Sequence, residues 1–412
     1  MSRWSSWLLR VAVALGSVGM TLGGVELVLR EFFPIRGMIY QLNDRYLFSY
    51  IPGSRRLTNP AGEDWPKVVV RINAAGRRGD ESALPHSAHR VVVYGDSFVA
   101  AEYTPESDTY VAQLERLLNE SVQGTKVLNA GVSGYGVDQE CLRIEDEIPS
   151  LRPDLVVVAI YAGNDYGDLL RNKLYRLDDR GQLSRNLPVI DESLRRDFRA
   201  PFELSSMQIL RALQSQHEKW QERQQQSPSA DALSVHVDQT TRRLEHRRAE
   251  FEDYVLKRDN VVRNFFSDEY DADVSVEPDS PSALYRVRLM ALVLEQIRRV
   301  TNQNGTNLLF LIIPEQCDAG STCEASVARH RYPGYRPSGL TDILESLARS
   351  EGVPYLNLFE AFRNGGAAMY HQIDGHWSAS GQLLAAHLTA NVILRAGLLR
   401  QASAKRADSI GE

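Results

Sequence analysis

Short apolar runs alternate with segments of helical spacing from about residue 86 to residue 398. Nearly continuous apolar runs such as RVVVY are typical of strands that are covered on both faces of a sheet. Segments with apolar residues every three or four positions are typical of helices that pack on one side. Strand–helix alternation predicts an α/β fold with a parallel sheet and helices on both faces. The expected strands are 89–95, 126–131, 154–165, 307–314 and 354–358, and the expected helices are 109–118, 137–148, 285–300 and 378–398.

The first apolar stretch of the chain is longer than these strands, and its centre carries no charge. Residues 11–25 read VAVALGSVGMTLGGV, and apolar neighbours beyond Arg10 and Glu26 extend the segment to 7–29. That length is enough for one helix to cross a bilayer. A cleaved signal peptide is the alternative, because Arg3 precedes an apolar middle, although no clear small-residue cleavage site follows. The pattern predicts a transmembrane anchor at 7–29, and the arginines on its two sides leave its orientation open.

Two stretches lack the strand–helix alternation. Residues 30–85 are predicted to be an irregular linker after the anchor. Residues 173–282 are rich in Gln, Arg, Glu and Asp, with helical periodicity in places and little strand signal. We expect a mainly helical insertion there, which serves either as a lid or partner surface or as a solvated excursion without a role in chemistry. The core domain is then formed by 86–172 and 283–400.

Composition narrows the classes of function. The chain has 412 residues, is 43% hydrophobic and 24% charged, and carries a net charge of −6, as expected of a folded globular protein. It has no long basic block, so no nucleic-acid partner is predicted. Cys317 and Cys323 stand in a loop-like stretch, where they form either a local disulfide or two thiols. Cys141 lies in a helical pattern, and no cysteine–histidine spacing indicates a zinc site.

Polar residues follow three of the predicted strands, and ligands of parallel sheets bind at the carboxyl ends of strands. The first strand ends in YGDSF, which puts Ser97 on a strand-to-helix turn beside the amide groups of a helix start. The second ends in NAGVSGYG, where the amide of Gly131 could face a substrate oxygen. The third ends in YAGND, where Asn164 could donate to an oxyanion. Taken singly, each of these is also an ordinary turn residue.

A fourth segment, IDGHWSASG, places Asp374 and His376 just before the last predicted helix. An aspartate that accepts from one imidazole nitrogen fixes the tautomer, so the other nitrogen can take a proton from a serine. The four segments together predict nucleophilic acyl transfer by Ser97, with His376 as general base and the oxyanion held by Ser97, Gly131 and Asn164. Ser133, in GVSGY, is a near match to the nucleophile motif G-x-S-x-G. Ser97 is preferred because it follows the first strand and leaves the other donors accounted for.

These segments resemble the four blocks of the SGNH/GDSL hydrolase family: YGDSF with the nucleophile, NAGVSGYG with the glycine donor, AGND with the asparagine donor and DGHW with the base. The resemblance covers roughly 72–398, apart from the polar insertion. It implies a flavodoxin-like three-layer α/β/α sandwich and ester hydrolysis without a metal or organic cofactor. RINAAGRRGDE and VELVLREFFP also look similar to segments of membrane-anchored bacterial members. That similarity implies a catalytic domain outside the cytoplasm, on the periplasmic side in a Gram-negative cell.

The last block departs from the common family pattern, because many members place the aspartate three residues before the histidine. Ile373 holds that position here, and Asp374 stands two residues before His376. A D-x-H spacing followed by tryptophan resembles the branch associated with O-acetylation of exported polysaccharides. Three functions therefore stay open: an esterase acting on O-acyl or O-acetyl groups of an extracytoplasmic substrate such as a glycan, a polysaccharide O-acetyltransferase, and a catalytically silent glycan-binding envelope protein. The sequence leaves the oligomeric state open.

Overall fold

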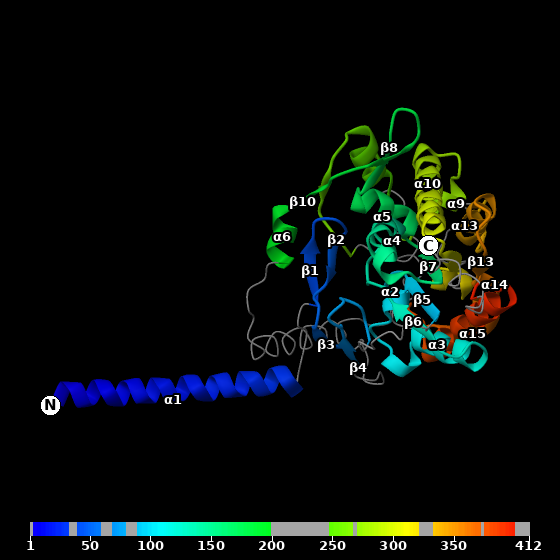
Figure 1. Cartoon of the computed structure of the whole chain (residues 1–412). Helices are drawn as coiled ribbons and strands as arrows, with labels where there is room; N and C mark the ends of the chain where they lie inside the picture. Colours follow the sequence, from blue (N-terminus) through cyan, green and yellow to red (C-terminus); the bar gives the residue numbers. More distant parts are fainter. Residues whose placement is uncertain are drawn as a thin grey trace, which may run out of the picture.

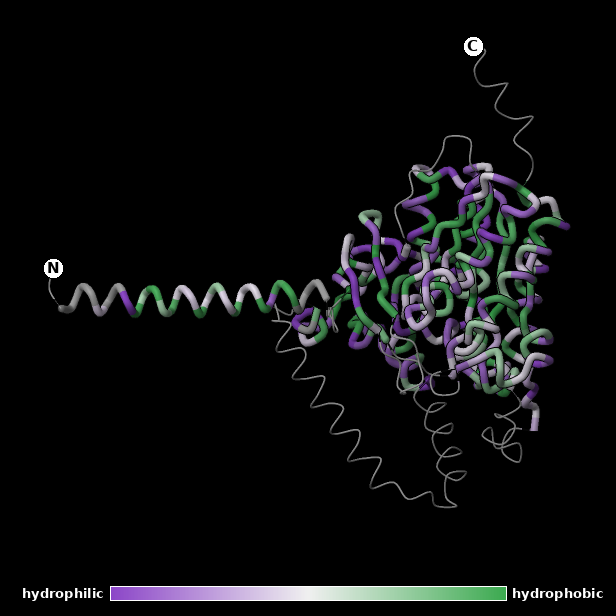
Figure 2. Tube along the Cα trace, turned by 90° about the horizontal axis from the view of Figure 1, so that it is seen from below, coloured by the Kyte–Doolittle hydropathy of each residue, from purple (hydrophilic) through white to green (hydrophobic). Residues whose placement is uncertain are grey.

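A long N-terminal helix stands apart from the folded body in this computed structural model (Figures 1 and 2). Helix α1 (Arg3–Phe32) contains a stretch, Arg10–Val28, that is long and apolar enough to cross a membrane. A signal sequence near an N-terminus has the same length and composition, so the helix fits either an anchor or a signal sequence. The structure describes residues 3–32, 39–58, 68–79, 89–198, 247–266, 270–320, 333–371 and 375–399.

The body is built around a five-stranded sheet in the order β13-β12-β7-β5-β6, with every neighbouring pair parallel. Counted along the chain, this is the order 2-1-3-4-5 of flavodoxin-like sheets. The predicted α/β fold with a parallel sheet is confirmed. After β6 the chain crosses to the other side of β5, and such a reversal opens a crevice at the carboxyl ends of the two strands beside it. The strands are β5 (His89–Tyr94), β6 (Thr125–Asn129), β7 (Leu155–Tyr161), β12 (Asn307–Ile313) and β13 (Tyr355–Asn357).

Alternate residues of each central strand face the two helical layers. In β5, Val91 and Val93 belong to one apolar cluster, and Val92 and Tyr94 belong to the other. This period of two explains why a nearly unbroken apolar run predicted a strand that is covered on both faces. The first cluster packs against α3 (Tyr110–Ser121), α14 (Phe359–Gly365) and α15 (Ala379–Arg395), and the second packs against α4 (Val137–Leu151), α5 (Asp165–Asn172), α10 (Pro281–Gln303) and α13 (Gly339–Ser350).

Two small antiparallel sheets lie within the segment 30–85, for which the sequence predicts an irregular linker. They pair β1 (Tyr40–Asn43) with β2 (Leu47–Tyr50) and β3 (Arg55–Thr58) with β4 (Val68–Arg71). Each strand has only four residues, too few for a clear alternation to register in the sequence. We call residues 39–58 and 68–79 the N-terminal arm.

The N-terminal arm packs on the α/β core. Phe48 of β2 is fully buried, and its ring lies 5.2 Å from that of Tyr135, centroid to centroid. The hydroxyl of Tyr135 donates to the backbone oxygen of Phe48 at 2.6 Å. Arg78, also buried, donates to the backbone oxygens of Ala100 and Thr104 at 2.6 Å each. Because these bonds join the arm to the turn after β5, the arm lies beside the carboxyl end of the sheet (Figure 1).

The segment 173–282 is described in part. Buried Arg247 and Arg286 bind the same carboxylate oxygen of Asp271, at 2.9 and 3.1 Å, which connects this segment to α10. Residues 199–246 and 267–269 lie outside the described residues, so a mainly helical insertion and the proposed domain limits stay predictions. Its described elements are β8 (Tyr175–Leu177), β9 (Leu183–Arg185), β10 (Val189–Ile190), α6 (Glu192–Phe198), the π-helix η2 (Glu252–Leu256), β11 (Val261–Val262) and α9 (Asp273–Val276).

Of the three cysteines, two lie in the described part of the chain. Cys317, in the short helix α11 (Gln316–Ala319), is disulfide-bonded. Cys141 is a free, buried thiol in α4, as its helical pattern predicted. Cys323, the partner considered for Cys317, lies outside the described residues.

Candidate active site

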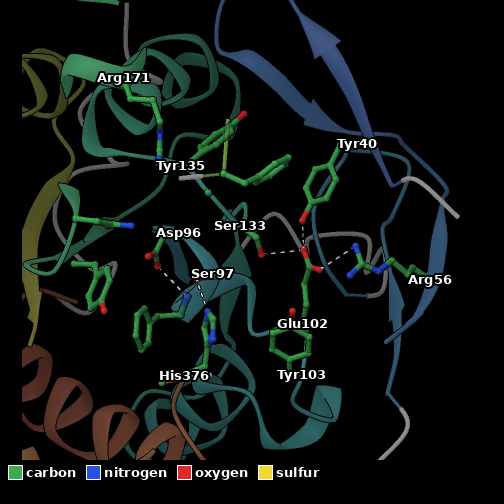
Figure 3. Close-up of a pocket in the computed structure, with 16 residues that line it drawn as sticks. Tyr40, Arg56, Asp96, Ser97, Glu102, Tyr103, Ser133, Tyr135, Arg171 and His376 are labelled. Carbon is green, nitrogen blue, oxygen red and sulfur yellow. Dashed lines mark hydrogen bonds and ion pairs between the residues drawn. The ribbon is translucent and has the colours of Figure 1, made fainter. Parts of the chain in front are cut away.

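A pocket with a cavity volume of about 410 Å³ lies where the carboxyl ends of β5 and β7 meet the N-terminal arm. Ser97, Asn164 and His376 line it from the α/β core, and Tyr40 and Arg56 line it from the arm. Figure 3 shows Ser97 and His376 on one side of the pocket and Tyr40 and Arg56 on the other. The position agrees with the rule that parallel sheets place their sites at strand carboxyl ends.

Ser97 and His376 meet in this pocket. Ser97 is the first residue of α2 (Ser97–Ala100), and its Oγ lies 2.8 Å from Nε2 of His376, which is 279 positions further along the chain. That distance is within the range over which a base takes a proton from a hydroxyl. Figure 3 marks the contact with a dashed line. The geometry therefore suits proton transfer from the serine to the imidazole.

The turn that carries Ser97 is fixed by the residues before it. A Cβ at Gly95 would lie 2.4 Å from Cγ2 of Val99, so only glycine lets the strand end pass this close to the helix. Asp96 caps α2, because its carboxylate accepts from the backbone N–H of Phe98 at 2.8 Å. Within the described part of the chain, the backbone N–H of Ser97 has no hydrogen-bond acceptor. This amide is thus available to a bound oxygen atom.

The loop that carries His376 is anchored by its neighbours. Trp377 is fully buried, and its ring lies 5.2 Å from Phe98 and 5.3 Å from Phe362. Gly375 has a φ of +76°, a left-handed conformation that favours glycine. The backbone oxygen of His376 accepts from the N–H of His371 at 2.7 Å, which closes the loop. The DGHW segment therefore supplies both the imidazole and the side chain that holds its loop to the core.

Two aromatic rings flank the imidazole, and sequence reasoning did not find them. The ring of Phe98 lies 5.2 Å from that of His376 at an interplanar angle of 37°, and the ring of Tyr103 lies 5.6 Å away at 70°. Such rings restrict the orientation of the imidazole. Both residues lie just after Ser97, where the apolar pattern gave no reason to single them out. Asp374, the predicted carboxylate partner of His376, lies outside the described residues, so its role stays a prediction.

The donors expected around the oxyanion differ in their positions. Asn164 lines the pocket and stands at the N-cap position of α5, and its donation to an oxyanion stays a prediction. Gly131 does not fit the predicted role, because its N–H donates to Oδ1 of Asn129 at 3.0 Å. A Cβ at Gly131 would also lie 2.5 Å from the backbone nitrogen of Ala100, so this glycine serves close packing against α2.

Gly134, three residues further on, lines the pocket instead. Its φ of +83° is again one that favours glycine. Within the described residues its N–H is not a donor to any acceptor. The same glycine-rich segment therefore does supply a pocket amide, but from Gly134, and only the three-dimensional turn distinguishes the two glycines.

Ser133, the rival nucleophile, lies in the same pocket but bonds elsewhere. Its Oγ donates to Oε1 of Glu102 at 2.9 Å. Because the Ser133 hydroxyl donates its hydrogen bond to this carboxylate, it is not positioned to act as the nucleophile. Of the two serines, Ser97 has the imidazole contact.

Two buried acids lie beneath the catalytic turn. Burial raises the pKa of Glu140 well above its ordinary value, and the nearby charge of Asp96 raises it further. Burial likewise raises the pKa of Asp165, with Glu140 and Asp96 as further causes. The surroundings of both groups therefore favour their protonated forms.

Comparisons with known proteins give only distant similarities. No protein-family model matches the sequence, and no curated protein matches it. Among solved structures, the chain is similar to a lipase/acylhydrolase from Enterococcus faecalis, with 14% identity, a TM-score of 0.36, and coverage of 74% of this chain and 95% of the other. It is also similar to Axe2, an acetylxylan esterase from Geobacillus stearothermophilus, with 13% identity, a TM-score of 0.37, and coverage of 74% and 94%. Similarities at this level carry no weight for the activity of this chain.

Proposed function

We propose that this chain is a serine esterase of the SGNH/GDSL type, which cleaves an ester through an acyl-enzyme intermediate. The observation that carries the proposal is the 2.8 Å contact between Oγ of Ser97 and Nε2 of His376 at the carboxyl end of the sheet. The pocket amides of Ser97 and Gly134 and the side chain of Asn164 support it, because acyl transfer needs donors for a developing oxyanion.

In the first half of the reaction, Oγ of Ser97 attacks the carbonyl carbon while His376 takes the hydroxyl proton. The carbonyl oxygen becomes an oxyanion, which accepts hydrogen bonds from the Ser97 and Gly134 amides and from the Asn164 side chain. The bond between the carbonyl carbon and the alcohol oxygen then breaks, and the imidazolium returns its proton to that alcohol. The acyl group stays on Ser97.

In the second half, water takes the place of the departed alcohol. His376 removes a proton from the water as its oxygen attacks the acyl carbon, and the same donors hold the second oxyanion. The bond to Oγ breaks, Ser97 regains its proton from His376, and a carboxylic acid leaves. If a second alcohol replaced water, the product would be a new ester, so the same residues would make an acyltransferase.

The proposed location is outside the cytoplasm at a membrane, with α1 as the anchor. The apolar stretch Arg10–Val28 supports a membrane segment. The disulfide bond at Cys317 supports an oxidising compartment, because disulfides are rare where thiols are kept reduced.

The test compares the purified wild type with Ser97→Ala on 4-nitrophenyl acetate. We expect a loss on the order of 10⁴-fold or more in kcat, because the nucleophile cannot be replaced, with an unchanged thermal midpoint. A fluorophosphonate probe, with the modified peptide located by mass spectrometry, should label Ser97. Labelling of Ser133, or turnover that survives in Ser97→Ala, would contradict the assignment. A wild type that hydrolyses no ester and takes up no probe would favour a silent binding protein.

A further inference from the structure

The wall of the pocket that faces the catalytic pair is organised around one carboxylate. Glu102 is nearly buried, with 5% of its side chain exposed, and its Oε1 accepts three hydroxyl hydrogen bonds. The donors are Tyr40 at 2.5 Å, Tyr50 at 2.7 Å and Ser133 at 2.9 Å. Burial raises the pKa of both tyrosines well above the ordinary value, and Glu102 raises it further, so both remain protonated donors. Oε1 is therefore fully used within the protein.

The second oxygen of this carboxylate has a much weaker contact. Its nearest cation is Arg56, whose Nη1 lies 3.8 Å from Oε2, too far for a hydrogen bond. The Arg56 side chain is 27% exposed and lines the pocket. In the part of the chain that the structure describes, its guanidinium makes no hydrogen bond. Its N–H donors therefore border the pocket, where water or a bound molecule can supply an acceptor.

Arg56 and Oε2 of Glu102 place a hydrogen-bond donor beside a hydrogen-bond acceptor. The charges of the two side chains cancel. A guanidinium only donates and a carboxylate only accepts, so the pair fits a ligand that does both within a short distance. Two neighbouring hydroxyl groups do so, because one oxygen can accept from Arg56 while the other hydroxyl donates to Glu102. An anionic group would meet the Glu102 charge, and a hydrocarbon would leave both groups unsatisfied.

We propose that Arg56 and Glu102 form a subsite for neighbouring hydroxyls on the alcohol part of the ester. The inference rests on the proposed function, because it concerns the alcohol that Ser97 releases. Figure 3 shows the subsite on the side of the pocket that faces the arm, and Asn164 lines the same pocket from the core. The ring of Tyr40 and that of Phe266, 5.4 Å apart, add an apolar surface beside it. The preferred substrates are thus acyl esters of polyols.

The same subsite serves either direction of acyl transfer. The alcohol that leaves in the first half-reaction and an alcohol that attacks in place of water occupy the same position relative to the acyl carbon. Polyol recognition therefore holds for hydrolysis and for transfer to a hydroxyl acceptor alike.

The experiment measures kcat/KM for a methyl glucoside monoacetate, for glycerol monoacetate and for 4-nitrophenyl acetate, whose leaving group carries no neighbouring hydroxyls. Arg56→Met and Glu102→Gln should lower kcat/KM for the polyol esters by about 10- to 100-fold, mainly through KM, because a hydrogen bond to a charged group is lost. The kcat/KM for 4-nitrophenyl acetate should fall far less. The ratio of kcat/KM for a polyol ester to kcat/KM for 4-nitrophenyl acetate should therefore decrease. Arg71→Met, which removes an exposed arginine from the same small sheet, should leave the ratio as in the wild type.

Losses shared by glucoside and glycerol esters place the recognition on the two hydroxyls, and a loss confined to the glucoside places it on a sugar. Either result supports the subsite. An equal fall in kcat/KM for all three esters would show that Arg56 and Glu102 are only structural and would overturn the subsite. Turnover of 4-nitrophenyl acetate by the wild type reports separately on the proposed function.

If the wild type shows no turnover, calorimetric binding of the glucoside monoacetate to Ser97→Ala decides. Binding that Arg56→Met weakens supports the subsite, and binding that is unchanged or absent overturns it.

Discussion

The pocket has two walls of different origin. One, the catalytic wall, consists of Ser97, Asn164 and His376, which follow strands or precede a helix of the α/β core. The other, the arm wall, consists of Tyr40 and Arg56 of the N-terminal arm and the Glu102 carboxylate, which accepts from Tyr40 and lies 3.8 Å from Arg56. A parallel sheet brings its strand ends together whatever its substrate, whereas added segments at those ends differ between proteins that share a fold. The comparison teaches that reaction type and substrate choice can be encoded in separate parts of one chain.

The two walls also differ in what holds them. The turn that carries Ser97 is held mainly by its own neighbours in the chain, Gly95 and the Asp96 cap. The arm wall depends on bonds between distant segments, because Tyr40 and Tyr50 reach Glu102 across 62 and 52 positions. Substitutions should therefore change the chemistry when they fall on the first wall, and stability or selectivity when they fall on the second.

After the loss of Ser97 itself, the largest effect is expected at Asn164. It stands at the N-cap position of α5, where its side chain makes no capping hydrogen bond, and its side-chain amide is proposed to donate to the oxyanion. Asn164→Asp keeps the size and shape of the side chain but removes the N–H donor. We expect kcat on 4-nitrophenyl acetate to fall by roughly a hundredfold or more in both Asn164→Asp and Asn164→Ala, with little change in KM. Wild-type turnover by the aspartate variant would overturn the proposed role of Asn164 at the oxyanion.

Much of the catalytic wall could be predicted because its signals are local. Buried strands give unbroken apolar runs, so all five strands of the central sheet were located to within a few residues. Their parallel arrangement then brought the positions of Ser97 and Asn164 to one edge. Gly134 was not singled out, because finding it depends on which amide the turn leaves without an acceptor. That is a property of the folded loop and not of its composition.

The arm wall could not be predicted from the same signals. Its strands have four residues each, so they give no long apolar runs in the sequence. Arg56 and Glu102 are 46 positions apart and look like ordinary charged surface residues in the sequence. Tyr50 and Ser133 both donate to Oε1 of Glu102, and tertiary contacts of this kind leave no periodic pattern in the sequence.

An intermediate effect is expected at Tyr50, which connects the arm to the core. Its ring is 1% exposed, and its hydroxyl donates to Oε1 of Glu102 at 2.7 Å. Tyr50→Phe removes one donor from a buried carboxylate and should lower the free energy of unfolding by about 2 kcal/mol. Tyr46→Phe is the matched control, because its hydroxyl donates to Asp146 at 2.6 Å on the exposed surface. Denaturant unfolding should show a change within about 0.5 kcal/mol for the control. Equal changes would mean that the Glu102 network does not hold the arm.

The smallest effect tests whether the catalytic wall depends on the shape of the loop beside its base. Gly375 has a φ of +76°, and a Cβ there would lie 2.9 Å from Oε1 of Gln316, beside the imidazole. Gly305 is the control, because its φ is +65° with nothing within 4 Å and it precedes β12 at the opposite end of the sheet. Replacing either glycine by alanine should cost about 1 kcal/mol of stability, since both positions are left-handed. Only Gly375→Ala should also lower kcat, by about tenfold, because a small displacement of His376 lengthens its contact with Ser97. Thermal unfolding and turnover of 4-nitrophenyl acetate measure the two effects separately.

If both variants kept full turnover, the loop would tolerate adjustment, and the precise placement of the imidazole would have to come from the flanking rings of Phe98 and Tyr103 instead.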